Sequence, residues 1–316
     1  MTAGLVLEWL RAGQLQLPLP GSGRTGQRWR RLSELTEVDV VAGRLAEAHT
    51  DAVAILAELG GAAARADELW GVWAAEAPDA VVTARGAGDA LVLDGTKAWC
   101  SGAGLCTHAL VSAHLTDGRR GLFAVDLRDE AVQPLEKTWR NAGMADSDTR
   151  SVQFNSAPAV PVGQPGDYLN RPGFWFGAIG VAACWLGGAR AVTAPLYERA
   201  AGGSADDHLL AHLGAVDAAI TAAQATLAVA ADQVDGDPRN SSGLGELTAR
   251  RARAVVEKAV DEVLTRTDRA LGPGPLCLDE QHARAVADLT VYVRQSHAER
   301  DLAALGQLAA AGQADG

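Results

Sequence analysis

The sequence has few of the features that mark secreted, metal-binding or nucleic-acid-binding proteins. Its 316 residues include only four cysteines, none of them in a CxxC pair. A disulfide scaffold or a zinc site is therefore not expected, and reduced thiols indicate a cytoplasmic protein. Lys and Arg number 28 against 39 Asp and Glu, a net charge of −11. This balance argues against a general polyanion-binding surface, so we expect no nucleic-acid partner.

Long hydrophobic runs are also scarce. The longest uncharged apolar stretch, Phe174 to Ala189, is shorter than the roughly 20 residues that a membrane span needs. The N-terminal apolar stretch has no basic region before it and carries Glu8 within it, which is not typical of a signal peptide. We therefore expect no membrane partner.

The chain changes its hydrophobic periodicity twice, which predicts three domains: an N-terminal helical domain over 1–69, a central β domain over 70–168 and a C-terminal helix bundle over 169–316. In the first domain, apolar residues recur every three to five positions between Asp39 and Leu59, as in an amphipathic helix. In the last domain, the apolar stretch from Phe174 is expected to be a helix, and three long helical patterns follow it: Asp206 to Val234, Glu246 to Leu271 and Gln281 to Leu308. Long helices with short connections predict an antiparallel four-helix bundle.

The middle domain instead shows short runs with period two, separated by turn residues. The strand candidates are Val72–Glu76, Val81–Thr83, Leu91–Leu93, Ala98–Cys100, Ala109–His114, Gly121–Asp126 and Ser151–Phe154. Such a pattern predicts a compact antiparallel barrel or sandwich. Within it, Leu91 to Ala103 (LVLDGTKAWCSGA) reads as a β-hairpin, because Asp94-Gly95 is a strong two-residue turn signal.

The segment LDGTKAWCSGA resembles the "L-x-G-x-K-x-W-I-T/S-x-G" segment of acyl-CoA dehydrogenases, which lies against the flavin. Three further matches follow in the family's order: GLFAVDL at Gly121–Leu127, WRNAGMADSDTRSVQFNSAPAVPV at Trp139–Val162 and FGAIGVAACWLGGARAV at Phe176–Val192. The resemblance implies an acyl-CoA dehydrogenase-like fold with a shortened N-terminal domain. It also implies a flavoprotein oxidoreductase with an FAD cofactor.

The same resemblance points to cofactor-binding residues. The flavin strand supplies Trp99, Cys100 and Ser101, and the family's "T-E-P-x-A-G-S-D" segment is matched by Glu76 without the hydroxyl that normally touches the flavin. The family's "Q-x-x-G-G-x-G" loop is matched by Gly272 and Gly274, where two prolines remove two N–H donors. The family's "R-x-x-F-G" arginine has no counterpart in the sequence. These departures weaken the expectation that FAD binds.

Acyl-CoA dehydrogenases use a glutamate as the catalytic base, at one of two positions. The first position is empty, since no acidic residue lies between Asp167 and Glu198. For the second position, Asp288 matches the family's "R-D-A" aspartate, and counting on from it places Ser296 where the glutamate should be. A shift of one to three residues would bring in Glu299. If 281–308 is one helix, His297 and Asp301 share the inward face and Glu299 lies roughly opposite. A histidine here resembles flavin-dependent monooxygenases of the same fold. His297 and Glu299 are therefore the two candidate catalytic residues.

Three functions remain open. The first is α,β-dehydrogenation of an acyl-CoA or other acyl thioester, with electrons passed to an acceptor. The second is a flavin-dependent monooxygenase that uses His297, and the third is a non-catalytic subunit with an eroded FAD site. In each case the family resemblance implies a homo-oligomer, a dimer or tetramer, or pairing with a paralogue. His208 and His212 have the spacing of metal ligands on a helix, but no third ligand accompanies them, so no metal site is predicted.

Overall fold

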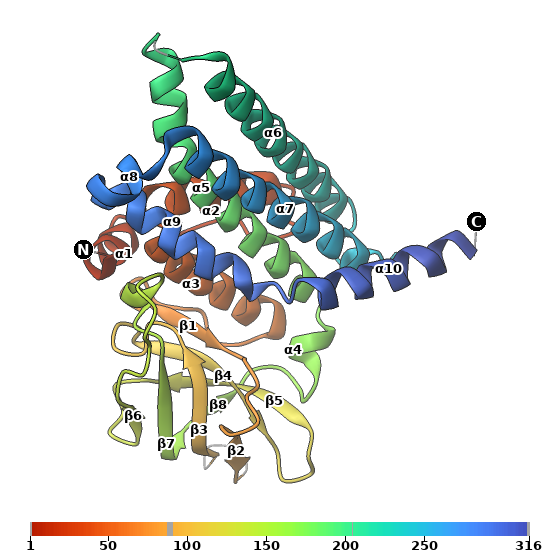
Figure 1. Ribbon diagram of the computed structural model, residues 1–316. Coiled ribbons are helices and arrows are strands. Elements are labelled where there is room, and N and C mark those ends of the chain that lie inside the picture. The colour runs from red at the N-terminus through yellow and green to blue at the C-terminus, as the bar shows by residue number, and fades with distance from the viewer. Residues whose placement is uncertain (1, 87–90, 204, 315–316) are drawn as a thin grey trace. The chain divides into compact units, whose positions relative to one another are not determined.

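The computed structural model describes residues 2–86, 91–203 and 205–314, without the side chains of 312–314 (Figure 1). The chain divides into two compact units. One, called here the β unit, contains residues 1–17, 45–141 and 145–174; the other, the helical unit, contains residues 18–44, 142–144 and 175–316.

The β unit is built on a curled sheet in the order β6-β7-β3-β2-β4-β5-β8, with β1 paired to β4. Neighbouring strands are antiparallel, except that β1 and β2 pair with β4 in parallel. The strands are β1 (Trp70–Trp73), β2 (Val82–Arg85), β3 (Val92–Cys100), β4 (His108–His114), β5 (Arg120–Asp126), β6 (Val132–Pro134), β7 (Arg150–Pro158) and β8 (Val160–Pro161). Each predicted run overlaps a strand, but Leu91–Leu93 and Ala98–Cys100 both fall on β3, and Val72–Glu76 overlaps β1 only at Val72 and Trp73. Strands β6 and β8 are additional.

The predicted hairpin at Asp94-Gly95 is wrong, because Val92 to Cys100 form one continuous strand. Gly95 pairs with Val82 across β2, and its φ is +116°. A Cβ at this position would collide with the carbonyl oxygen of Val81. The glycine therefore permits a close approach of two strands and does not form a turn.

Both faces of this sheet are covered within the unit. One face encloses a core that includes Trp73, Leu93, Phe123 and Phe154. On the other face, residues of α3 (Val40–Leu59) pack against the sheet, and this second core joins Ala52, Ile55 and Leu56 to Trp70, Leu110, Leu122 and Val162. Two short helices, α1 (Thr2–Arg11) and α4 (Asp167–Asn170), and the 3₁₀ turn η2 (Ala145–Ser147) complete the unit.

The helical unit surrounds the long helix α5 (Gly173–Ala201). The other helices are α2 (Thr25–Val38), α6 (Asp207–Gly236), α7 (Gly245–Leu271), α8 (Pro273–Leu278), α9 (Glu280–Tyr292) and α10 (Glu299–Ala314), with the 3₁₀ turn η3 (Val293–Gln295) between the last two. Glycines on α5 allow close packing: a Cβ at Gly187 would meet the Ser33 carbonyl of α2, and one at Gly188 would meet Leu289 of α9. Trp185 is buried in this centre.

By length and composition alone, two helices of this unit, α5 and α6, are long and apolar enough to cross a membrane. The apolar window of α5 is mostly buried inside the protein, as in the core helix of a bundle, whereas that of α6 is only 28% buried. The helix α6 runs alongside α7, and the last turns of α10 extend away from the rest of the helical unit (Figure 1).

The predicted single helix over Gln281–Leu308 is wrong. Helix α9 ends at Tyr292, a 3₁₀ turn follows, and α10 begins only at Glu299. Ser296 has extended backbone angles and Ala298 has a φ of +44°, neither of which a helix allows. A period-3.6 pattern on both sides of a three-residue break resembles one continuous helix in sequence, because the break contains no glycine or proline to mark it.

Candidate functional site

The exposed tryptophan of β3 is the most prominent feature of the β unit. Trp99 lies where the pairing register of β3 with β7 shifts between Lys97 and Cys100. Its φ is +61° and the residue is 61% exposed. The Trp139 ring stands edge-on to it, with centroids 6.3 Å apart and an interplanar angle of 88°. A β-bulge of this kind redirects a side chain out of the sheet, so the Trp99 ring is available to stack on a flat ligand.

A chain of hydroxyl groups follows Trp99. Ser101 Oγ lies 3.0 Å from Thr149 Oγ1, which lies 2.7 Å from Ser147 Oγ. The Trp73 indole N–H donates to the carbonyl of Ser101 and so fixes the backbone beside these hydroxyls. Each hydroxyl has one donor and two acceptor positions. Ser147 is buried, whereas Ser101 and Thr149 are partly exposed, so the latter two hydroxyls could meet the polar edge of an isoalloxazine ring.

The other predicted cofactor residues of the β unit lie elsewhere. Cys100 is fully buried, and its thiol donates to the Lys97 carbonyl, so only its backbone could meet a ligand. Burial raises the pKa of this thiol. Glu76 is engaged by Lys97 and Ser112. Burial raises the pKa of Glu76, but the charge of Lys97 and the Ser112 hydroxyl outweigh it, so the pKa is lowered and the carboxylate stays ionised.

In the helical unit, the segment matched to the family's dinucleotide loop is a short helix. Gly272 has a φ of +68° and ends α7, and Pro273 occupies the first turn of α8, where a proline is well tolerated. Gly274 lies within α8, with open space around it. The first turn of a helix normally leaves N–H groups free for an anion, but Pro273 and Pro275 remove two of them here. The residues present therefore fit a flavin ring better than a full dinucleotide.

The break between α9 and α10 holds both candidate catalytic residues. The His297 side chain is 60% exposed, and Glu299 lies exposed in the first turn of α10. The predicted inward direction of His297 is therefore wrong. Its backbone N–H donates to Asp301 Oδ2 at 3.0 Å, and its Nδ1 lies 3.7 Å from the same oxygen. The pairing of His297 with Asp301, expected from helical spacing, is present across the start of α10.

The carboxylate of Asp301 is held ionised by its surroundings. Burial raises the pKa of Asp301, but the His297 N–H bond and the charges of His297, Arg253 and Arg250 outweigh it and lower the pKa. Arg250 lies 3.3 Å from Asp301 Oδ1 and also stacks over the Trp175 ring. Arg250 and Arg253 are therefore half-buried residues that pack on tryptophan rings, Arg250 over Trp175 and Arg253 over Trp185.

Sequence reasoning missed Glu257. This carboxylate on α7 accepts a hydrogen bond from Ser296 Oγ at 2.5 Å, so Ser296, which stands at the family's glutamate position, is itself buried against an acid from another helix. The only signal in the sequence was an acidic residue directly after Val256 in the apolar stripe of α7. That signal is too common to single out one residue.

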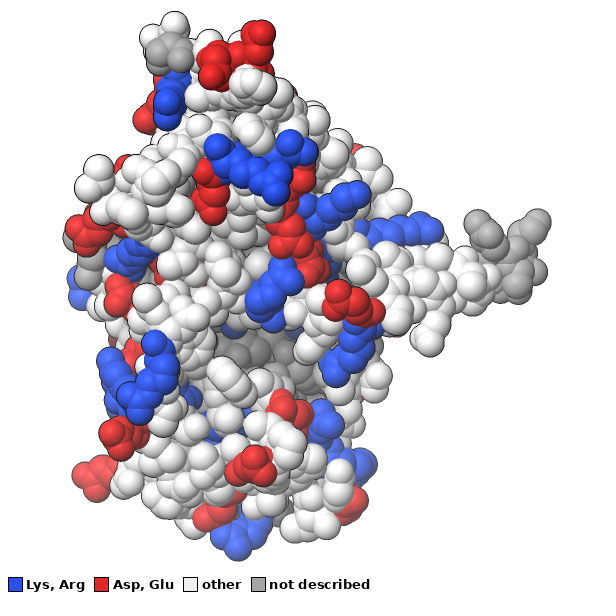
Figure 2. Space-filling model, viewed as in Figure 1, with Lys and Arg blue, Asp and Glu red and all other residues white. Residues whose placement is uncertain are grey.

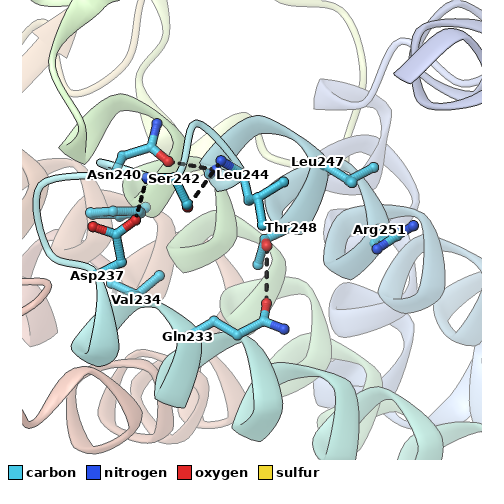
Figure 3. Close-up of a pocket in the computed structure, with 11 residues that line it drawn as sticks. Gln233, Val234, Asp237, Asn240, Ser242, Leu244, Leu247, Thr248 and Arg251 are labelled. Carbon is cyan, nitrogen blue, oxygen red and sulfur yellow. Dashed lines mark hydrogen bonds between the residues drawn. The ribbon is translucent and has the colours of Figure 1, made fainter. Parts of the chain in front are cut away.

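A separate pocket of about 230 Å³ lies where α6 and α7 meet. Figure 3 shows that most of its polar groups close the connecting loop: Asp237 accepts from the backbone of Ser242, and Asn240 accepts from Gly245. The Thr248 hydroxyl donates to Gln233. This pocket uses its polar groups for the local structure of the hairpin.

Surface charge gives no single-sign site on the face seen in Figure 2. Lys and Arg are interspersed there with Asp and Glu, and neither sign forms a continuous patch. In the part of the chain that the structure describes, no group of three or more His, Cys, Asp or Glu side chains could hold a metal ion.

Comparison with known proteins agrees with this architecture. Residues 74–157 match the family model described as acyl-CoA dehydrogenase, middle domain. Among curated proteins, none matches the chain. The predicted class of a helical region, a central β domain and a C-terminal helix bundle is confirmed: the chain has the acyl-CoA dehydrogenase-like fold, and the family model itself matches the middle domain.

Three solved structures illustrate the likeness. TdsC from Paenibacillus sp. A11-2, in complex with FMN and indole, is 19% identical with a TM-score of 0.77, over 89% of this chain and 82% of that chain. The methanesulfinate monooxygenase MsuC from Pseudomonas fluorescens is 16% identical with a TM-score of 0.75, over 98% and 95%. FkbI, for biosynthesis of the methoxymalonyl extender unit of Fk520, is 17% identical with a TM-score of 0.79, over 98% and 93%.

Proposed function

We propose that the protein is a flavin-dependent monooxygenase that uses reduced FMN. The observation that carries this proposal is the α9–α10 break. Ser296 occupies the position of the dehydrogenase base, and an exposed histidine, His297, and an exposed carboxylate, Glu299, lie close to it in sequence. Because an imidazole can both give and take a proton near neutral pH, His297 suits oxygen chemistry, whereas abstraction of an α-proton from a thioester calls for a placed carboxylate.

The reaction would consume one O₂ and one reduced flavin. One oxygen atom would enter the substrate and the other would leave as water, with two electrons and two protons drawn from the reduced flavin. Bound flavin supplies the redox chemistry. In the β unit, Trp99 would stack on the ring, and the hydroxyls of Ser101 and Thr149 would meet its polar edge. In the helical unit, His297 would hold a proton at its imidazole.

Two observations support FMN over FAD. The segment expected to meet the pyrophosphate is the helix α8, and the ring-binding features are confined to the β unit around Trp99. Relatives with the same fold point in the same direction, since TdsC is named a dibenzothiophene monooxygenase and has been solved with bound FMN. FAD, as the family resemblance implies, remains the alternative cofactor.

The second candidate is α,β-dehydrogenation of an acyl thioester with Glu299 as base. The match of residues 74–157 to the acyl-CoA dehydrogenase middle domain favours it, and the exposed carboxylate at the start of α10 is the group that would act. A third is a non-catalytic subunit, which the lost dinucleotide loop favours.

A flavin titration, followed by reoxidation of bound reduced FMN with O₂ and by anaerobic reaction with butyryl-CoA, distinguishes the three candidate functions. We expect the purified protein to retain FMN, His297→Asn to change the rate at which bound reduced FMN is reoxidised by O₂, and Glu299→Gln to leave that rate unchanged. Anaerobic butyryl-CoA should not bleach the flavin. Bleaching that disappears in Glu299→Gln would instead establish the dehydrogenase. Failure to retain either FMN or FAD would establish the non-catalytic subunit.

We also propose that the protein is a homo-oligomer that associates through α6. Leu210 and Val229 on this helix are about half exposed, and a helix of such apolar composition is normally covered. Light scattering should show a mass above that of one chain, and Val229→Asp should lower it. A monomer at all accessible concentrations would contradict the proposal.

A further inference from the structure

The carboxylate of Glu257 holds the residue that stands at the family's glutamate position. Ser296 Oγ donates to Glu257 Oε2 at 2.5 Å, and the Arg294 guanidinium lies 3.5 Å from the other oxygen. Ser296 is 7% exposed and the Glu257 side chain 13%. Glu257 comes from the interior of α7, so this contact fastens the α9–α10 break to a helix distant in sequence.

The same hydroxyl fixes the backbone on the far side of His297. Ser296 Oγ accepts a bond from the Ala298 N–H at 3.2 Å, and Ala298 is held at a φ of +44°, which is unfavourable for a residue with a side chain. Residues 296 and 298 are thus both restrained through one oxygen, whose own proton is given to Glu257. Between them, only the His297 side chain points outward.

A connection between two helices does not require this arrangement. A buried carboxylate costs free energy unless it is well bonded, and an apolar pair at positions 257 and 296 would join α7 to the break without that cost. The hydroxyl–carboxylate pair instead supplies direction, because a hydrogen bond loses strength steeply with angle. Such precision is useful where one side chain must be aimed.

We propose that Glu257 is a positioning residue that, through Ser296, fixes the backbone of 296–298 and so aims the imidazole of His297. This inference rests on the proposed function, in which His297 handles the proton. Glu257 makes and breaks no bond in the reaction. Its part is to accept the Ser296 proton and keep the break in one conformation.

The test uses the full chain with two measurements. The first is hydrogen exchange of the 293–301 segment in flavin-free protein, and the second is reoxidation of bound reduced FMN by O₂. Glu257→Ala should speed exchange by about 10-fold or more, because the segment opens more easily without the Ser296 hydrogen bond. It should also change the reoxidation rate by about 10-fold or more, since a misplacement of a reacting group by about 1 Å can change a catalysed rate by two orders of magnitude. FMN affinity should stay within about 3-fold, because Glu257 holds His297 and no flavin-binding group.

Two further variants separate positioning from simple stabilisation. Glu257→Gln should restore both measurements to within about 3-fold, because an amide oxygen can still accept the Ser296 proton. Glu262→Ala is the matched control, since Glu262 lies on the same helix but pairs with Arg266, and it should change neither. The double variant Glu257→Ala with His297→Asn should behave like His297→Asn alone in reoxidation.

Unchanged exchange in Glu257→Ala would overturn the inference, as would failure of Glu257→Gln to restore function while the fold is intact. If His297→Asn itself has no effect on reoxidation, the proposed function fails. The exchange data then decide alone whether Glu257 holds the break.

Discussion

The ammonium nitrogen of Lys97 lies 3.2 Å from Glu76 Oε1 and 2.8 Å from Ser112 Oγ, inside the β unit. Lys97 is only 2% exposed, so its charge depends on this partner. The pair explains why Glu76, which the family resemblance places at the flavin, is engaged with the interior of its own unit. Because the Lys97 ammonium is buried, the stability of the β unit depends on the negative charge of Glu76.

Neutralising Glu76 should lower the free energy of unfolding more than replacing Lys97 by an apolar residue. Glu76→Gln leaves a buried ammonium without its counter-charge and should lower the free energy of unfolding by about 2 kcal/mol, less than for a fully buried pair because Glu76 is partly exposed. Lys97→Met should be nearly neutral. Urea unfolding followed by tryptophan fluorescence measures both. Asp117→Asn, at an exposed pair with Arg119, should show no change, and an equal loss in Glu76→Gln and Asp117→Asn would contradict the prediction.

The loss in Glu76→Gln should depend on pH. Burial lowers the pKa of Lys97 and Glu76 partly restores it, so the variant should lower this pKa further. A lysine with a lowered pKa in the folded state binds fewer protons there than when unfolded, so stability rises with pH until the unfolded pKa of about 10.4 is reached. We therefore expect the difference between variant and wild type to shrink above neutral pH. A difference that grows with pH would contradict this assignment.

Trp99→Ala should weaken FMN binding by about 10-fold, which corresponds to one aromatic stacking contact. The free energy of unfolding should change little, because the ring is mostly exposed. Quenching of flavin fluorescence gives the affinity. Val160→Ala, an exposed apolar residue on β8 of the same unit, serves as the control and should bind FMN normally. Unchanged affinity in Trp99→Ala would remove the ring site from this strand.

Thiol labelling should discriminate sharply between the four cysteines. Cys277 is exposed, while Cys100 and Cys184 are buried, and burial also raises the pKa of Cys100 and removes its reactive thiolate. Mass spectrometry after brief alkylation should find Cys277 modified and Cys100 unmodified, with all four modified after denaturation. Labelling of Cys100 at the rate of Cys277 would show that the β3 bulge opens in the native protein.

Ala298 gives a test of the α9–α10 break itself. Because its φ is positive, Ala298→Gly should relieve strain that offsets the added freedom of the unfolded chain, for a net change near zero or slightly stabilising. Ala309→Gly, inside α10, should instead lower helix stability by about 1 kcal/mol. Equal losses in the two variants would indicate that Ala298 is helical in solution.

Motifs predicted the sheet better than they predicted its turns. The runs at Ala109–His114 and Gly121–Asp126 are strands whose successive residues enter two different cores: Val111 and Phe123 lie in one, and Leu110 and Leu122 lie in the other. Asp94-Gly95 has the composition of a turn, yet it lies within β3, because β2 approaches so closely that only glycine fits. No local pattern distinguishes these two uses of glycine, since the neighbouring strand that requires it comes from another part of the chain.

The sequence by itself determined the class of fold, the position of the α9–α10 segment and the pair of candidates, His297 and Glu299, since hydrophobic periodicity and ordered motifs are local properties. Only the tertiary structure decided how those residues are presented. The exposure of Trp99 depends on a register shift against β7, and the restraint of His297 depends on a carboxylate from α7. Both arise from contacts between segments distant in sequence, whose geometry is set by packing and by the need to pair buried polar groups.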